Sequence, residues 1–247
     1  MNRLYVAAQN SLSREWAPVA ELRETAAGYE LRFTKGATRI PGFAGLGRMQ
    51  SLDEVYHSTQ LFPFFSNRLF SKSRPEYKDY LRWLGLETAP SSPFEVLSIT
   101  GGARATDSFE LVSLPQPVEG KIAWKFFPRG LRYLPPATLD LIFKQSPGAS
   151  VALMKDIQNP KDHQAVAIRS TYPETVLMGY VPRYFCSGLC RLLDSNPAAV
   201  KVTLQQINAD APWDLKVLLS VEAPVPLDFD MTADAPDFEI LTSENAQ

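Results

Sequence analysis

Cysteine and histidine are scarce in this chain, whose 247 residues contain only Cys186, Cys190, His57 and His163 from these two types. A closed zinc site needs about four ligands. The two cysteines are four residues apart and are expected on one face of a helix that begins after Pro182. We therefore expect structural or surface thiols, with no metal and no cofactor.

Long apolar runs are also missing. No window approaches the roughly 18 apolar residues of a membrane span, and residues 1–16 lack the apolar stretch of a secretory signal. The composition is 45% hydrophobic, which permits a sizeable core in a chain of this length. These features predict a globular, cytoplasmic protein with no membrane association.

Familiar catalytic motifs are absent as well. The sequence has no Gly-x-Ser-x-Gly motif, no cysteine with a partnering histidine, and no phosphate-binding loop. Asp156 and Asp162 could be proposed as an acid and base pair, but they flank a turn, where aspartate is common for backbone reasons. We expect a protein that is not an enzyme, and an uncharacterised hydrolase remains an alternative.

Charge is unevenly distributed along the chain. Residues 1–119 carry 13 basic and 13 acidic side chains, residues 120–223 carry 12 and 8, and residues 224–247 carry none and 6, which gives the total of −2. The middle segment is compatible with a polyanionic partner and equally with an ordinary surface. Residues 225–247 form an acidic tail, expected to be a flexible arm that would shield the basic face.

Residues 1–112 are expected to form a small sheet packed with several short helices, in an α+β fold. Ser51 and Glu54 have the spacing of a capping box, which predicts a helical turn through Tyr56. Proline and capping signals predict further short helices after Pro75 and Ser92. Alternating apolar residues predict strands at 4–8, 19–22 and 29–33.

The proline-rich run 113–120 is the best linker and marks the predicted domain boundary. Residues 121–224 beyond it show about six strands and two helices, the count of a small, partly open barrel or a compact sandwich. The expected strands are 122–127, 151–154, 165–168, 176–181, 200–207 and 215–221, and the expected helices are 136–145 and 184–195.

Residues 121–224 also carry the best candidates for binding. Arg132 and Tyr133 follow the first strand, Lys161 and Asp162 lie in a turn that begins at Asn159, and further basic and aromatic residues follow. Cations contact phosphate, and rings stack on unpaired bases. The alternative is purely structural: Tyr133 and Tyr180 would be half-buried barrel residues, Arg132 and Arg183 solvated rim charges, and Asp162 the cap of its turn.

Three motifs together resemble the HIRAN domain: Gly130-Leu131-Arg132-Tyr133, then Leu153 to Asp156 with Asn159-Pro160-Lys161-Asp162, then Gly179-Tyr180-Val181-Pro182-Arg183. HIRAN domains are OB-like barrels, and in fork-remodelling ATPases they hold the 3′ end of single-stranded DNA. The resemblance implies that Arg132 and Tyr133 contact the terminal nucleotides and that Asp162 accepts a hydrogen bond from the 3′ hydroxyl. Tyr180 and Arg183 would line the groove toward the phosphates, and Trp213 would add a later ring.

This sequence departs from the HIRAN pattern at one position. Lys161 replaces the ring that usually precedes the aspartate, which removes a stacking surface and adds a phosphate contact. Asn159, at the start of the same turn, is included with the nucleic-acid-binding residues.

Residues 61–84 resemble the amino-terminal subdomain of HipA-type toxin kinases, although no kinase motif is present. The leading hypothesis is a protein that recognises single-stranded DNA ends through residues 121–224. The alternative is an antitoxin-like or regulatory protein of a toxin–antitoxin system that binds a HipA-type kinase partner through residues 1–112.

Overall fold

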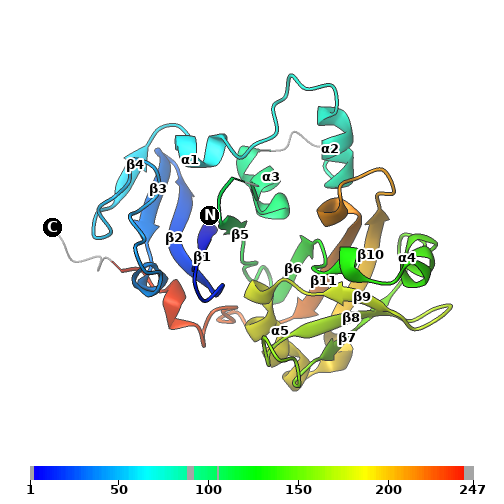
Figure 1. Ribbon diagram of the computed structural model, residues 1–247. Coiled ribbons are helices and arrows are strands. Elements are labelled where there is room, and N and C mark those ends of the chain that lie inside the picture. Colours follow the sequence, from blue (N-terminus) through cyan, green and yellow to red (C-terminus); the bar gives the residue numbers. More distant parts are fainter. Residues whose placement is uncertain (1–2, 88–91, 105, 242–247) are drawn as a thin grey trace. The chain divides into compact units, whose positions relative to one another are not determined.

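The protein is described by a computed structural model that covers residues 3–87, 92–104 and 106–241 (Figure 1). The chain divides into two compact units, each assembled from separate segments. Unit 1 contains Met1–Arg74, Pro90–Leu114 and Thr232–Gln247, and unit 2 contains Pro75–Ala89 and Pro115–Met231. The chain passes from unit 1 to unit 2 twice, after Arg74 and after Leu114, and the predicted linker 113–120 includes the second of these points. No helix in the described ranges is long and apolar enough to cross a membrane.

Unit 1 is built on a five-stranded antiparallel sheet in the order β4-β3-β2-β1-β5. Its strands are β1 (Arg3–Gln9), β2 (Trp16–Thr25), β3 (Gly28–Phe33), β4 (Tyr56–Ser58) and β5 (Phe109–Val112). The three strands predicted from alternation lie within β1, β2 and β3. Leu4, Val6, Leu22 and Phe33 are fully buried in the core on this sheet, which accounts for the alternation of apolar residues.

Short helices complete unit 1: η1 (Lys35–Arg39), α1 (Pro63–Ser66), α3 (Pro93–Thr100) and η5 (Pro236–Phe238). Helix α3 has the predicted signals, because the Ser92 hydroxyl accepts a bond from the amide of Glu95 and Gly101 ends the helix in the left-handed region. The predicted helical turn after Ser51 is wrong. The Tyr56 hydroxyl instead bonds both the amide and the carbonyl of Ser51, and the chain continues into β4.

Unit 2 contains two antiparallel three-stranded sheets, in the orders β10-β11-β6 and β7-β8-β9. The strands are β6 (Lys121–Phe126), β7 (Val151–Lys155), β8 (Val166–Ser170), β9 (Leu177–Tyr180), β10 (Lys201–Ile207) and β11 (Val217–Pro224). The helices are α2 (Tyr77–Trp83), η2 (Leu131–Tyr133), α4 (Pro136–Phe143), α5 (Arg183–Ser195), η3 (Pro197–Ala199) and η4 (Trp213–Leu215). Six strands and helices near both predicted positions are therefore present.

The expected OB-like barrel is not closed. Among the residues that the structure describes, the two sheets are connected by single bridges, between Arg129 and Tyr180 and between Ser150 and Thr203. Pro128 follows β6 and has no amide hydrogen to donate, which limits pairing with β9 to one residue pair. The described part of unit 2 nevertheless has the expected mixture of small sheets and few helices.

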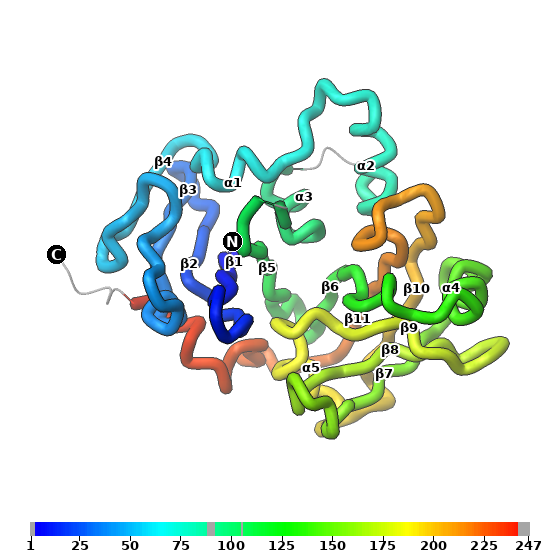
Figure 2. The backbone as a smooth tube through the Cα atoms, in the orientation of Figure 1, coloured from blue at the N-terminus to red at the C-terminus, as the bar shows by residue number. Residues whose placement is uncertain are grey.

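The acidic tail differs from the expected flexible arm. Residues 232–241, red in Figure 2, belong to unit 1, where η5 packs on β2 and η1. Lys35 pairs with Glu239 and Arg39 pairs with Asp237. Phe238 meets Tyr5 edge to face, with ring centres 4.8 Å apart. Two cations and one ring of unit 1 thus hold this part of the tail.

Candidate nucleic-acid interface

The loop between β7 and β8, residues 156–165, carries three of the predicted binding residues. The Asp156 amide donates to the carbonyl of Ala165 at 2.8 Å and closes the base of the loop. Inside it, the Asn159 side chain accepts from the amide of Lys161 at 3.1 Å, and Asp162 Oδ1 accepts from the amide of Gln164 at 2.9 Å. Both side chains bond their own backbone, as expected for turn residues.

This geometry gives Asp162 the turn-capping role that the structural alternative assigned to it. Its side chain is half-buried, and the neighbouring Lys161 is exposed. In the described ranges, Lys161 forms no side-chain hydrogen bond or ion pair. The loop therefore presents one free cation beside one fixed carboxylate.

Tyr180 is fixed to the same loop through Asp156. Asp156 Oδ2 accepts from the Tyr180 hydroxyl at 3.0 Å and from the Asn159 amide nitrogen at 3.1 Å. Partial burial raises the pKa of Tyr180, and the bond to Asp156 raises it further, so the hydroxyl remains a donor at neutral pH. The hydroxyl of Tyr180 is therefore engaged with the protein, and its ring is half-buried.

Gly179 allows the segment after β6 to approach β9 closely. Its φ is +111°, and a Cβ atom added there would lie 2.5 Å from the carbonyl oxygen of Arg129. This close approach permits the paired backbone hydrogen bonds between Arg129 and Tyr180, at 2.8 and 2.9 Å. Gly130 then adopts a left-handed conformation and starts η2. The pairing with β9 thus sets the position of Arg132 and Tyr133.

Arg132 and Tyr133 form an exposed pair on η2. The Tyr133 ring is 75% exposed. The Arg132 guanidinium lies 4.8 Å from the centre of this ring and donates to the Tyr133 hydroxyl at 2.6 Å. Tyr133 is therefore not a half-buried barrel residue, and its ring face is shared between a cation and solvent.

Trp213 lies on η4, which contacts η2. Its indole is 44% exposed, and Lys216 Nζ lies 5.4 Å from its ring centre. Lys216 also donates to the carbonyl of Ala209 at 2.6 Å. The site thus contains a second ring with an adjacent cation.

Asn208 holds η4 in place. It is 1% exposed, and its side-chain nitrogen donates to the carbonyls of Leu215 at 2.7 Å and Trp83 at 2.9 Å. The first bond fixes the end of η4 and the second fixes α2. Arg82 and Trp83 of α2 also bond the carboxylate of Asp210, at 2.6 and 3.2 Å.

Arg183 is the first residue of α5 and is exposed. Helix N-termini attract anions, and a basic first residue adds to this attraction. The pKa of the nearby Cys186 thiol is raised to about 12, mainly by burial; the charge of Asp162 contributes to this rise and the charge of Arg183 opposes it. Asp162 and Arg183 therefore both lie near this thiol.

The structure thus places the predicted residues in two groups. Asn159, Lys161, Asp162 and Tyr180 belong to one loop and its neighbouring strand, while Arg132 and Tyr133 lie on η2 beside Trp213. Within the described part of the chain, no hydrogen bond or ion pair joins Asp162 to Arg132 or Tyr133. The backbone pairing of Arg129 with Tyr180 connects the groups.

Sequence reasoning missed Lys216 and the role of Asp156. Lys216 follows Trp213 by three residues, a spacing that places both side chains on one side of a helical turn. The sequence placed Asp156 in a HIRAN-like motif and in a possible acid and base pair, but did not indicate that its carboxylate orients Tyr180 and Asn159. Across the residues that the structure describes, no three histidine, cysteine, aspartate or glutamate side chains gather as a metal site.

Comparison with known protein families matches the part of unit 2 that carries the predicted binding residues. The family model for the HIRAN domain matches residues 125–225. Residues 125–225, called the HIRAN segment below, are therefore similar to the HIRAN domain. This HIRAN segment includes all eight predicted binding residues, and the match confirms the resemblance inferred from the three motifs. The resemblance of residues 61–84 to the HipA subdomain is not supported by these comparisons.

Two solved structures are similar to the chain. The HIRAN domain of human HLTF is 16% identical, covering 49% of this chain and 92% of its own, with a TM-score of 0.34. A protein from Lactobacillus plantarum is 18% identical, covering 42% of this chain and 99% of its own, with a TM-score of 0.31. No curated protein matches the chain significantly.

Proposed function

We propose that the HIRAN segment binds nucleic acid and prefers single-stranded DNA with a free 3′ hydroxyl. The family match supports DNA binding. The observation that carries the proposal is the pair of exposed rings, Tyr133 and Trp213, each with a cation against it. Folding does not require either ring to be exposed beside a positive charge, whereas a single strand offers bases for stacking and phosphates for the cations.

Asp162 supplies the preference for a 3′ end in this proposal. A carboxylate accepts a hydrogen bond from a hydroxyl and repels a phosphate. Its Oδ1 atom is held by the Gln164 amide, which fixes the orientation of the whole carboxylate. Oδ2 is then the acceptor for the terminal hydroxyl.

Fluorescence anisotropy of a labelled oligothymidylate tests this role. We expect weaker binding when the 3′ end is phosphorylated, and a smaller difference between the two ends for Asp162→Asn. Asparagine keeps an oxygen for the Gln164 amide, so this variant changes the charge while preserving the turn. Equal affinity of the natural protein for both ends would remove the end-recognition role.

Ring and cation contributions are tested separately. Each stacked base contributes about 1 to 3 kcal/mol, so Tyr133→Ala and Trp213→Ala should each raise Kd by roughly 5- to 150-fold. Tyr133→Phe keeps the ring and should bind nearly as well as the natural protein. If both alanine variants bind normally, the rings are not part of the interface.

Lys201 provides a matched control for charge. It is exposed at the start of β10, while η4 follows the other end of this strand, about 20 Å away at the usual rise per residue. Arg132→Ala should lower the slope of log Kd against log salt by about 0.7. Lys201→Ala removes the same charge and should leave the slope unchanged.

A further inference from the structure

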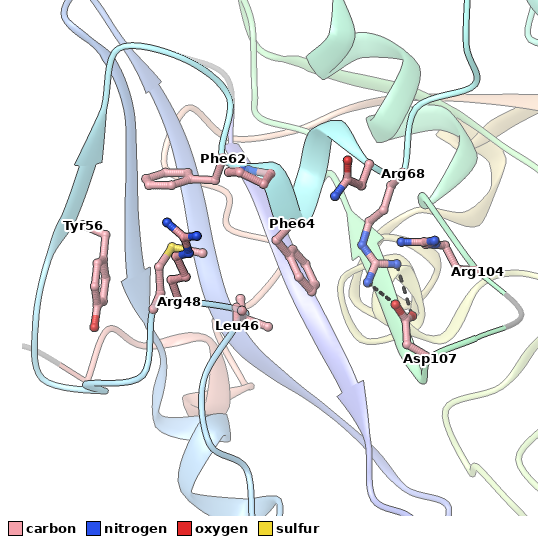
Figure 3. A pocket seen from close by; sticks show the side chains of 12 residues that line it. Leu46, Arg48, Tyr56, Phe62, Phe64, Arg68, Arg104 and Asp107 are labelled. Atoms are coloured by element: carbon pink, nitrogen blue, oxygen red, sulfur yellow. Dashed lines mark hydrogen bonds and ion pairs between the residues drawn. The ribbon is translucent and has the colours of Figure 1, made fainter.

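Unit 1 contains a pocket that the proposed DNA interface does not use. Its volume is about 690 Å³, within the range of about 300 to 1,000 Å³ that is usual for small-molecule sites. Four separate parts of the chain line it: the turn around Leu46 and Met49, strand β4, helix α1 with the residues around it, and the side chains of Arg104 and Asp107 (Figure 3).

Aromatic and aliphatic side chains form the apolar part of the pocket. Tyr56, Phe62 and Phe64 contribute rings, and Leu46 and Met49 contribute aliphatic surface. Phe64 packs edge to face on Phe65 and Phe109, with ring centres 5.1 and 5.3 Å away, so its position is fixed. An apolar wall with several rings suits a flat apolar ligand.

Cations outnumber anions around the same pocket. Arg48, Arg68 and Arg104 line it together with a single carboxylate, that of Asp107. Asp107 is paired with Arg68, at 2.6 and 3.2 Å. Arg48 and Arg104 are exposed, and neither forms an ion pair or side-chain hydrogen bond within the described ranges. Two uncompensated positive charges therefore face solvent at the pocket.

Arg68 adds a buried polar atom to this pocket. Its side chain is 1% exposed, and its guanidinium lies 4.3 Å from the centre of the Phe64 ring. Both terminal nitrogens are bonded to Asp107, and one of them also donates to the carbonyl of Gly102 at 2.9 Å. Its Nε atom is buried and has no hydrogen-bond partner among the described residues. A buried donor without a partner is costly unless a bound group satisfies it.

We infer that this pocket binds a small aromatic anion, a carboxylate or a phosphate ester carried on a flat apolar body. The ring system would pack against Tyr56, Phe62 and Phe64. The anionic group would lie against one of the two exposed arginines, Arg48 or Arg104, which flank Phe64 on opposite sides in Figure 3. The inference is independent of the proposed DNA binding, because every lining residue belongs to unit 1 and the DNA interface belongs to unit 2.

Displacement of the fluorescent sulfonate 1-anilinonaphthalene-8-sulfonate from the full-length protein tests the inference. We expect 2-naphthoate to displace it at a concentration at least tenfold lower than the neutral 2-naphthamide. AMP compared with adenosine gives the same contrast for a phosphate ester. The pair that shows the larger contrast identifies whether a carboxylate or a phosphate is preferred.

Variants at exposed positions keep the core intact. Arg48→Gln together with Arg104→Gln should weaken naphthoate binding at least tenfold and leave naphthamide binding nearly unchanged. Asn67 is an exposed lining residue, and Asn67→Trp should fill the pocket and abolish binding of the sulfonate. Lys72 is exposed and does not line the pocket, so Lys72→Gln serves as the charge control.

Three results would overturn the inference. One is equal displacement by the charged and neutral member of both pairs. Another is sulfonate binding that neither the double arginine variant nor Asn67→Trp changes. The third is binding only of a peptide that ends in a free carboxyl-terminal phenylalanine, with no binding of the small anions, because this would identify a protein partner instead.

Discussion

The Arg68–Asp107 pair allows a quantitative prediction about unit 1. Asp107→Ala removes the carboxylate that meets both terminal nitrogens of Arg68 and leaves a guanidinium whose side chain is 1% exposed. Removing one partner of a buried ion pair costs about 3 to 5 kcal/mol, because the remaining charge is uncompensated. Asp107 is 25% exposed, so water reaches this side of the pair, and we expect the lower end, about 3 kcal/mol.

Two further variants separate charge from local structure. Asp107 Oδ1 also accepts from the amide of Phe109 at 3.3 Å. Asp107→Asn retains an acceptor for that amide and for Arg68, so it should cost about 1 to 2 kcal/mol. Arg68→Met combined with Asp107→Ala removes both charges and keeps an unbranched apolar chain in place. This double variant should be less destabilised than Asp107→Ala alone.

Hydrogen exchange of peptides from β1 to β3 is the suitable assay, because it reports opening of unit 1 even if the two units unfold separately. A loss of about 3 kcal/mol should speed exchange there by roughly 100-fold. Peptides from β10 and β11 of unit 2 provide the internal control. A double variant that exchanges as fast as Asp107→Ala would refute the assignment of the cost to the unpaired charge.

Three further predictions concern unit 2. Gly179→Ala should lower DNA affinity and stability more than Gly130→Ala. Both glycines have a positive φ, but only at Gly179 would an added Cβ atom clash with a backbone carbonyl. Anisotropy and thermal unfolding of both variants measure the two effects. Asn208→Ala should cost about 1 to 3 kcal/mol in denaturant unfolding, since two buried carbonyls lose their donor, and it should weaken DNA binding through Trp213 while Trp213→Ala leaves stability nearly unchanged. Above pH 9 the unfolded chain loses the Cys186 proton that the folded chain keeps up to about pH 12, so the free energy of unfolding should fall as the pH rises through this window. Cys186→Ala should make this fall shallower, as measured by denaturant titrations at successive pH values.

Local signals in the sequence were sufficient to predict most strands and the turn at residues 159–162. The apolar residues of β1 to β3 lie in buried strands, with β1 and β2 buried on both faces and β3 alternating in burial. Asn159 and Asp162 bond their own loop as their residue types favour. Such features depend on neighbours within a few residues. They can therefore be read without knowledge of the tertiary fold.

Features that depend on distant partners were not predictable. The capping-box pattern after Ser51 did not form a helix, because the Tyr56 hydroxyl takes both polar groups of the Ser51 backbone. Helix α2 follows Pro75 as predicted, but a signal for the start of a helix does not indicate which unit the helix packs on. Asn208 joins α2 to unit 2. The pocket in unit 1 draws on four segments that no single motif connects.

Open pairing between the two sheets of unit 2 likewise follows from tertiary contacts. The count of six strands predicted a small, partly open barrel or a compact sandwich, and a closed barrel would require continuous ladders at both junctions between the sheets. In the described part of unit 2, each junction between the sheets consists of one bridge, from Arg129 to Tyr180 and from Ser150 to Thr203. At the first of these junctions, Gly179 allows the segment before η2 to approach β9. The same close approach therefore accounts for the single bridge and for the position of the exposed Arg132–Tyr133 pair.

A turn-capping role for Asp162 is compatible with recognition of a strand end, because the two carboxylate oxygens are separate acceptors. Oδ1 is bonded to the Gln164 amide, and the described residues supply no hydrogen bond to Oδ2. An acceptor that is already oriented loses little conformational freedom when a ligand binds. The bond that stabilises the turn therefore also prepares Oδ2 for a hydroxyl. The two interpretations of Asp162 differ in one measurable consequence: only a carboxylate that faces the strand end disfavours a 3′ phosphate, and Asp162→Asn removes that discrimination while the turn is kept.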